Sequence, residues 1–254
     1  MCQLCEISAP TRTSRRRFLA AAACTAASLA LAPQAFAKET KPPPKPQNVL
    51  APDAALDRLV KGNLRYLDGV SRRHDFKHER EALAGGQNPF AGILSCADSR
   101  IAPEYAFDTG RGDLFVCRIA GNFASDETIA SLEYASAVLN GPLFMVLGHD
   151  SCGAVDAAIK SLKDNTTLPG HLPSLVTAIA PAVKATEGKP GDRLANAIRQ
   201  NVIDNVAKLK SATPILSAAV DQGKLRVVGA VYRLTDGKVE LVADAKTAGD
   251  VKVR

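Results

Sequence analysis

Two stretches of the chain decide its fold: Ala91-Gly92-Ile93-Leu94-Ser95-Cys96-Ala97-Asp98-Ser99-Arg100 and Leu143-Phe144-Met145-Val146-Leu147-Gly148-His149-Asp150-Ser151-Cys152. In each stretch a short apolar run leads directly into residues that bind metals or move protons. Apolar runs of this length, bounded by Gly or Pro and separated by helical patterns, are typical of buried parallel strands. Because the carboxyl ends of parallel strands meet at one edge of an open sheet, we expect the two motifs to come together there.

The residues that end these strands form a ligand set for tetrahedral zinc. Two thiolates and one imidazole, from Cys96, Cys152 and His149, suit zinc, and a fourth position takes water or a carboxylate. We therefore predict one zinc ion per chain, with Asp98 as a fourth ligand only if the site is closed. A purely structural zinc site is the alternative, although closed sites more often use Cys-x-x-Cys pairs throughout.

Asp98 and Arg100 stand two residues apart at the end of the first strand. The guanidinium group of arginine offers a fork of donors that matches a carboxylate. Paired with Arg100, Asp98 would be held off the metal and kept ionised, where it can orient a water or hydroxide on the zinc. In the alternative interpretation the pair only stabilises a turn.

The remaining pattern predicts an α/β fold. Strands and helices alternate through the middle of the chain, which indicates a mainly parallel central sheet flanked by helices. Asp236-Gly237 between two apolar runs is a strong signal for a C-terminal antiparallel hairpin. We expect strands that end at 96, 119 and 147, hairpin strands at 225–234 and 239–242, and helices at 53–67, 79–83, 126–139, from 153 onward, and at 172–187, 192–210 and 214–222.

The front of the chain predicts export. Ser14-Arg15-Arg16-Arg17-Phe18-Leu19 precedes an Ala/Leu-rich run that ends in Ala35-Phe36-Ala37, and this order is typical of a cleavable signal of the twin-arginine type. The apolar run is too short and too rich in alanine for a membrane span, so we expect no stable membrane anchor after export. We predict a signal peptide at 1–37, a Lys/Pro-rich linker at 38–52, a single domain at 53–254 and a periplasmic or otherwise exported protein.

Charge and cysteine content argue against a nucleic-acid-binding protein and against a disulfide-stabilised one. The net charge is +6; the first 37 residues hold four arginines and one glutamate, which gives +3 and leaves +3 for the rest. That bias is too weak to argue for nucleic acid as a partner. Only three of the six cysteines follow the signal, Cys96, Cys117 and Cys152, and an odd, scattered set argues against a disulfide framework. We interpret Cys117 as a buried thiol without chemistry.

The motifs Cys96-Ala97-Asp98-Ser99-Arg100 and His149-Asp150-Ser151-Cys152-Gly153 resemble the two signature motifs of the β-class carbonic anhydrases. The resemblance extends over roughly residues 52–242. It implies zinc on the two cysteines and the histidine, with Asp98 and Arg100 as the catalytic dyad. The implied reaction is reversible hydration of carbon dioxide to bicarbonate and a proton, by hydroxide on the zinc.

The resemblance also implies a branch and an assembly. Gln87, Phe115 and Tyr134 stand where the plant-like branch has residues that face the substrate, and in the family these come partly from a neighbouring subunit. We therefore expect a homodimer or homotetramer. A second branch is regulated by bicarbonate and has tryptophan where this chain has Ile93, so we expect an open site without that regulation.

Two alternatives to this function stay open on the sequence. The same fold and metal also support hydrolysis of carbonyl sulfide or carbon disulfide. A non-catalytic zinc-binding scaffold is the other alternative, although a scaffold would need neither the Asp98–Arg100 pair nor Gln87.

Overall fold

The computed structural model describes residues 49–243. The predicted signal peptide at 1–37 and residues 38–48 of the predicted linker lie outside the described residues, as do residues 244–254 of the predicted domain. Among the described residues, no helix is long and apolar enough to cross a membrane.

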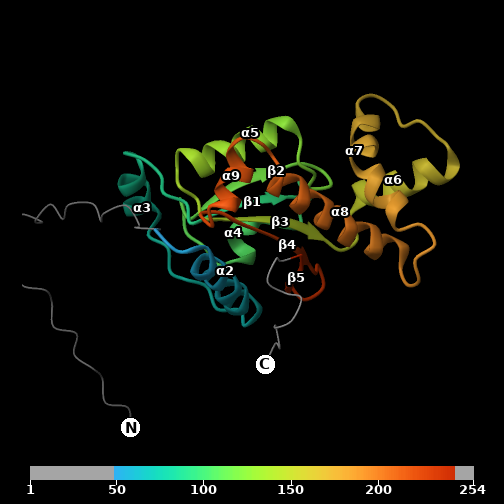
Figure 1. Cartoon of the computed structure of the whole chain (residues 1–254). Helices are drawn as coiled ribbons and strands as arrows, with labels where there is room; N and C mark the ends of the chain where they lie inside the picture. The colour runs from blue at the N-terminus through green and yellow to red at the C-terminus, as the bar shows by residue number, and fades with distance from the viewer. Residues whose placement is uncertain (1–48, 244–254) are drawn as a thin grey trace, which may run out of the picture. The chain divides into compact units, whose positions relative to one another are not determined.

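A five-stranded sheet forms the centre of the protein (Figure 1). Its strand order is β2-β1-β3-β4-β5, and every neighbouring pair is parallel except β4 and β5. The predicted parallel sheet with a terminal antiparallel hairpin is therefore confirmed. The strands are β1 (Ala91–Ser95), β2 (Leu114–Arg118), β3 (Leu143–His149), β4 (Arg226–Tyr232) and β5 (Val239–Ala243).

Each predicted helix is present, with shifted ends. The helix predicted to begin at Asp53 begins at Pro52, and Asp53 lies in its first turn and pairs with Arg226 at 2.7 Å. The helix that follows β2 begins at Asp126 as predicted, and Ser125 caps it, because its hydroxyl accepts from the Thr128 N–H. The helices are α2 (Pro52–Leu67), α3 (Phe76–Leu83), α4 (Pro103–Ala106), α5 (Asp126–Ala137), α6 (Gly153–Asp164), α7 (Leu172–Ala185), α8 (Arg193–Lys210) and α9 (Ile215–Asp221).

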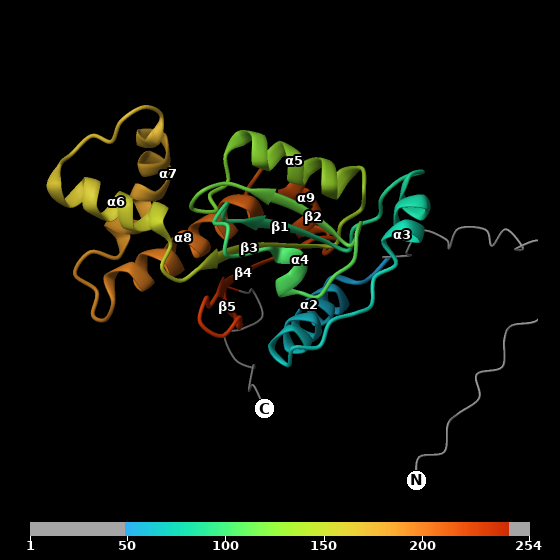
Figure 2. The ribbon, with the colours of Figure 1, turned by 180° about the vertical axis from the view of Figure 1, so that it is seen from behind.

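Helices cover both faces of the sheet (Figures 1 and 2). Apolar side chains of α2 and α4 pack on one face, against alternate residues of β1, β3 and β4 such as Ile93 and Met145. Helices α5, α8 and α9 pack on the other face, against the intervening residues such as Leu94 and Val146. β1 and β3 are buried on both faces, which explains why their sequences are continuous apolar runs.

A third apolar cluster lies beyond the carboxyl ends of the strands. It is formed by α6, α7 and the first half of α8, and it contains Cys96 and Cys152. Figure 1 shows α6 and α7 at this end of the molecule, to one side of the sheet. The two predicted cysteine ligands are therefore embedded in a packed environment.

Candidate metal centre

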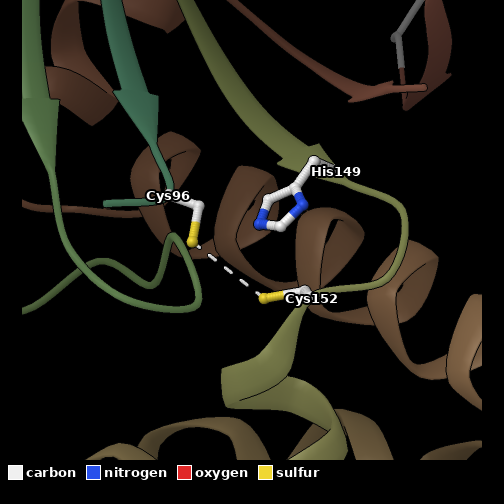
Figure 3. A group of neighbouring side chains, drawn as sticks. All are labelled: Cys96, His149 and Cys152. Carbon is white, nitrogen blue, oxygen red and sulfur yellow. Dashed lines mark hydrogen bonds between the residues drawn. The ribbon is translucent and has the colours of Figure 1, made fainter. Parts of the chain in front are cut away.

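Three side chains from three elements converge at the edge of the sheet (Figure 3). Cys96 follows the last residue of β1, and His149 is the last residue of β3. Since β1 and β3 are adjacent and parallel, their carboxyl ends bring the thiol and the imidazole together. Cys152 stands at the residue before α6, where the short turn after His149 returns to the site.

The geometry of this group fits a tetrahedral metal ion. The two Sγ atoms lie 4.0 Å apart, and the three candidate ligand atoms lie within 4.8 Å of one another. Two sulfurs bound to one zinc ion at 2.3 Å would lie about 3.8 Å apart in a tetrahedron. All three side chains are buried, with at most 3% of any residue exposed.

The imidazole of His149 is oriented for ligation. Its Nδ1–H donates to the main-chain carbonyl of Asp150 at 2.7 Å, which leaves the lone pair on Nε2. Nε2 is buried and has no hydrogen-bond partner among the described residues. A buried, unpaired nitrogen costs free energy unless something binds it. A metal ion between this nitrogen and the two sulfurs would remove that cost, so the residues present fit zinc.

The two thiols favour loss of a proton from one of them. The hydrogen bond between Cys152 and Cys96 lowers the pKa of Cys96 well below its usual range and, together with burial, raises the pKa of Cys152. The main-chain N–H of Gly121 also donates to Cys96 Sγ, at 3.3 Å. The site therefore stabilises negative charge on sulfur, which is the form that binds metal.

Asp98 lies beside the three candidate ligands and is held by Arg100. The Arg100 Nε and Nη2 atoms donate to its two carboxylate oxygens at 2.9 and 2.7 Å. These hydrogen bonds hold the pKa of Asp98 well below its usual range, so the carboxylate stays ionised at neutral pH. Asp98 Oδ2 lies 3.7 Å from His149 Nε2, close enough to act on a molecule bound at the metal.

The segment that carries Cys96 and Asp98 is fixed by an arginine of β2. Arg118 donates to the main-chain carbonyls of Cys96, Asp98 and Ile101, at 3.0, 2.6 and 2.8 Å. Sequence reasoning missed this role, as it missed the Gly121 and Asp150 contacts, because each uses a main-chain atom that no motif displays. One feature of the sequence could have indicated this role of Arg118: the residue stands at the carboxyl end of the strand beside Cys96.

The three predicted substrate-facing residues do not join the metal group within one chain. Gln87 is exposed and precedes β1, whereas Cys96 follows β1, so the two lie toward opposite ends of that strand. Phe115 pairs in register with Gly92, four residues before Cys96. The ring of Phe115 lies 6.3 Å from that of Tyr134 on α5, and both residues stand at the β2 edge of the sheet.

Two other features lie apart from the metal group. Cys117 is half-buried on β2, and burial raises its pKa, which makes its thiolate scarce at neutral pH. A surface cleft of about 660 Å³ is lined by residues of α2, α3 and the 104–114 segment, including Tyr66, Phe76 and Tyr105. None of the predicted site residues lines this cleft.

Comparison with known proteins gives the family. Residues 91–239 match the family model described as carbonic anhydrase, and this range contains Cys96, Asp98, His149 and Cys152. The chain belongs to the β-class carbonic anhydrase family. It is 40% identical over 191 residues to carbonic anhydrase 2 of Mycobacterium tuberculosis, which covers 75% of this chain and 92% of that one.

Two further relatives agree with this assignment. The chain is 36% identical over 201 residues to a carbonic anhydrase of Mycolicibacterium smegmatis, covering 79% of this chain and 98% of the relative. The β-carbonic anhydrase of Coccomyxa, solved with acetazolamide, is similar in structure, with a TM-score of 0.56 and 25% identity over 75% of this chain and 82% of that one. The similarity therefore covers the described domain and is not confined to the two motifs.

Proposed function

We propose that the protein is a zinc enzyme that interconverts carbon dioxide and water with bicarbonate and a proton. The observation that carries this proposal is the buried Cys96–His149–Cys152 group beside the Asp98–Arg100 ion pair, in a chain of the carbonic anhydrase family. A hydrolase of sulfur analogues is not favoured, because the matched relatives are carbonic anhydrases.

The ligand atoms in this proposal are Cys96 Sγ, Cys152 Sγ and His149 Nε2. Zinc supplies Lewis acidity; in carbonic anhydrases with three histidine ligands it lowers the pKa of water from 15.7 to about 7. Asp98 accepts a hydrogen bond from the attacking water and so fixes its orientation. Arg100 positions Asp98 and keeps it ionised through the paired hydrogen bonds.

In this proposal Asp98 does not bind the metal, which would leave a fourth ligand position for water. Both of its oxygens are engaged by Arg100, and it does not belong to the group of atoms that lie within 4.8 Å of one another. A carboxylate held this way gains little from turning toward the metal, since it would give up two charge-assisted hydrogen bonds. An open position is what catalysis at zinc requires.

We infer that Gln87, Phe115 and Tyr134 serve the site of a neighbouring copy, in a homodimer or homotetramer. Support comes from their positions, which are toward the far end of the strands or at the β2 edge of their own chain. β2 is an edge strand whose side chains are half-exposed. Tyr134 on the adjoining α5 and Val138 at the cap of that helix are 48% and 57% exposed. An uncovered apolar sheet edge favours pairing with another chain.

We infer that the protein is exported by the twin-arginine route. The inference rests on Arg15-Arg16-Arg17-Phe18-Leu19 and on the Ala35-Phe36-Ala37 cleavage pattern. That route carries folded proteins, which suits a chain whose metal ligands come together only on folding. The mass of the protein recovered from the periplasm tests this: a chain that begins at Lys38 supports it, and a full-length cytoplasmic chain contradicts it.

Removal and return of the metal tests the proposed reaction. The purified protein is stripped with a chelator, and carbon dioxide hydration is followed in a stopped-flow instrument before and after zinc is restored. We expect hydration to disappear with the metal and to return with zinc. Hydration that persists in the stripped protein would contradict the proposal.

A further inference from the structure

One face of α8 carries three polar residues that all reach the same loop. Asn201, Asn205 and Lys208 stand at i, i+4 and i+7, and the helix packs between the second and third apolar clusters. Asn201 and Asn205 are 2% and 6% exposed. Asparagine is a weak helix former, and a buried amide costs free energy unless it is paired. Two asparagines on a buried helix face therefore require specific hydrogen-bond partners.

Their partners are main-chain atoms of the 121–124 loop. Asn201 Nδ2 donates to the carbonyl of Gly121 at 2.8 Å, and Asn205 Oδ1 accepts from the N–H of Ala124 at 2.7 Å. Asn205 Nδ2 also donates to Asn201 Oδ1 at 3.1 Å, which fixes the orientation of the Asn201 amide. Lys208 Nζ donates to the carbonyl of Ala124 at 2.6 Å.

The same loop touches the metal group through Gly121. The Gly121 N–H donates to Cys96 Sγ at 3.3 Å, while its carbonyl accepts from Asn201. Gly121 has φ +84°, and a Cβ atom there would lie 2.6 Å from Ile179 Cδ1. Gly121 is therefore held from the α8 side by a hydrogen bond to its carbonyl and is packed closely on the α7 side.

We propose that Asn201 is a positioning residue for the metal centre, which holds the carbonyl of Gly121 and so orients the N–H on the other side of that residue toward the Cys96 sulfur. A donor aimed at a ligand sulfur stabilises the negative charge that the metal shares, and such outer contacts change metal affinity by about 10–100-fold. Asn201 touches neither metal nor substrate, and it acts only through Gly121. The inference rests on the proposed function, because it requires zinc on Cys96.

A matched control exists on the other side of the sheet. Asn63 is a buried asparagine of α2, 5% exposed, whose Nδ2 donates to the carbonyls of Ala106 and Gly237 at 2.9 Å each. Like Asn201, it connects a helix to main-chain carbonyls elsewhere in the fold. It makes no hydrogen bond to Cys96, His149 or Cys152. Asn63→Ala therefore reports the general cost of losing such a residue.

The experiment compares zinc release from the zinc-loaded parent, Asn201→Ala and Asn63→Ala into a chromogenic chelator. We expect Asn201→Ala to release zinc at least about tenfold faster than the parent. We expect Asn63→Ala to release it at the parent's rate, although both variants unfold at lower temperature. After substitution by cobalt, the thiolate-to-cobalt charge-transfer band should shift in Asn201→Ala and stay in place in Asn63→Ala.

Equal release rates in the parent and Asn201→Ala, or equal acceleration in the two variants, would overturn the inference and leave a structural role for Asn201. If Asn201→Ala does not fold, the pair Asn201→Ser and Asn63→Ser is compared in the same way, since serine leaves room for water to satisfy the carbonyls. A parent protein that holds no zinc would overturn the proposed function, and the inference with it.

Discussion

Arg100 engages both carboxylate oxygens of Asp98, and its own main-chain N–H donates to Asp98 Oδ1 at 2.9 Å as a third contact. Three donors on one small carboxylate fix its direction as well as its charge. The carboxylate is held 3.7 Å from the one imidazole nitrogen of the metal group that lacks a partner among the described residues. Asp98 is therefore close to the reaction centre without belonging to the ligand set.

Asp98→Asn should retain zinc and lose most activity. The amide keeps the size of the side chain but loses the negative charge that orients the attacking water, so we expect hydration to fall by about 100-fold. Stopped-flow hydration with zinc content measured on the same sample checks this. The control is Asp75→Asn, which removes an exposed carboxylate paired with His78 on α3. Full activity in Asp98→Asn would show that the dyad is not catalytic.

Arg100→Ala should make activity depend more steeply on pH. Without the guanidinium, the Asp98 carboxylate is free to turn toward zinc, and carboxylates are zinc ligands. Hydroxide competes better for that position as pH rises, so we expect a larger loss at pH 7 than at pH 8.5. The check is the pH dependence of the hydration rate, measured for the parent and the variant. Profiles of the same shape would mean that Arg100 does not keep Asp98 off the metal.

Cys152→Ser should lose zinc and stability together. Metal binding is coupled to folding, so loss of one ligand weakens both, and each kcal/mol lost lowers the unfolding midpoint by about 2–4 °C. Cys117→Ser is the matched control, because Cys117 is a half-buried cysteine on β2 outside the metal group. Metal analysis and thermal unfolding are measured on both variants. Full zinc occupancy in Cys152→Ser would refute the ligand assignment.

Val138→Arg should break the proposed assembly. Val138 is an exposed residue that caps the C-terminal end of α5, the helix beside β2, and a buried unpaired charge there would be costly on association. We expect a dimer or tetramer for the parent and a smaller species for the variant, by light scattering after size exclusion. The control is Leu172→Arg, an exposed apolar residue on α7. A monomeric parent would contradict the assembly.

The sequence predicts the sheet and the convergence of the three candidate ligands because both depend on local pattern. Continuous apolar runs before Cys96 and His149 indicate buried parallel strands, and parallel strands align their carboxyl ends. The α/β class and the terminal hairpin are confirmed on these grounds. The convergence of Cys96, His149 and Cys152 follows from the same rule, with the short turn before α6 supplying the third residue.

The contacts that support the site could not be predicted in the same way. The Asn201–Gly121 hydrogen bond joins residues 80 apart through a carbonyl, and Arg118 binds three carbonyls. Main-chain partners have no sequence signature, so only the fold reveals them. Helix caps could not be predicted from residue type alone, because a cap depends on local dihedral angles: Ser125 in extended backbone caps α5, although Asp126 is as good a capping residue by type.

The most direct test of the proposed function is zinc content paired with stopped-flow carbon dioxide hydration, on the protein from Lys38 onward, at pH 7 and pH 8.5. We expect about one zinc per chain, the stoichiometry of a single ligand group, and hydration at both pH values. Hydration only at pH 8.5 would mean that Asp98 closes the site. One zinc per chain without hydration at either pH would contradict the proposed function itself.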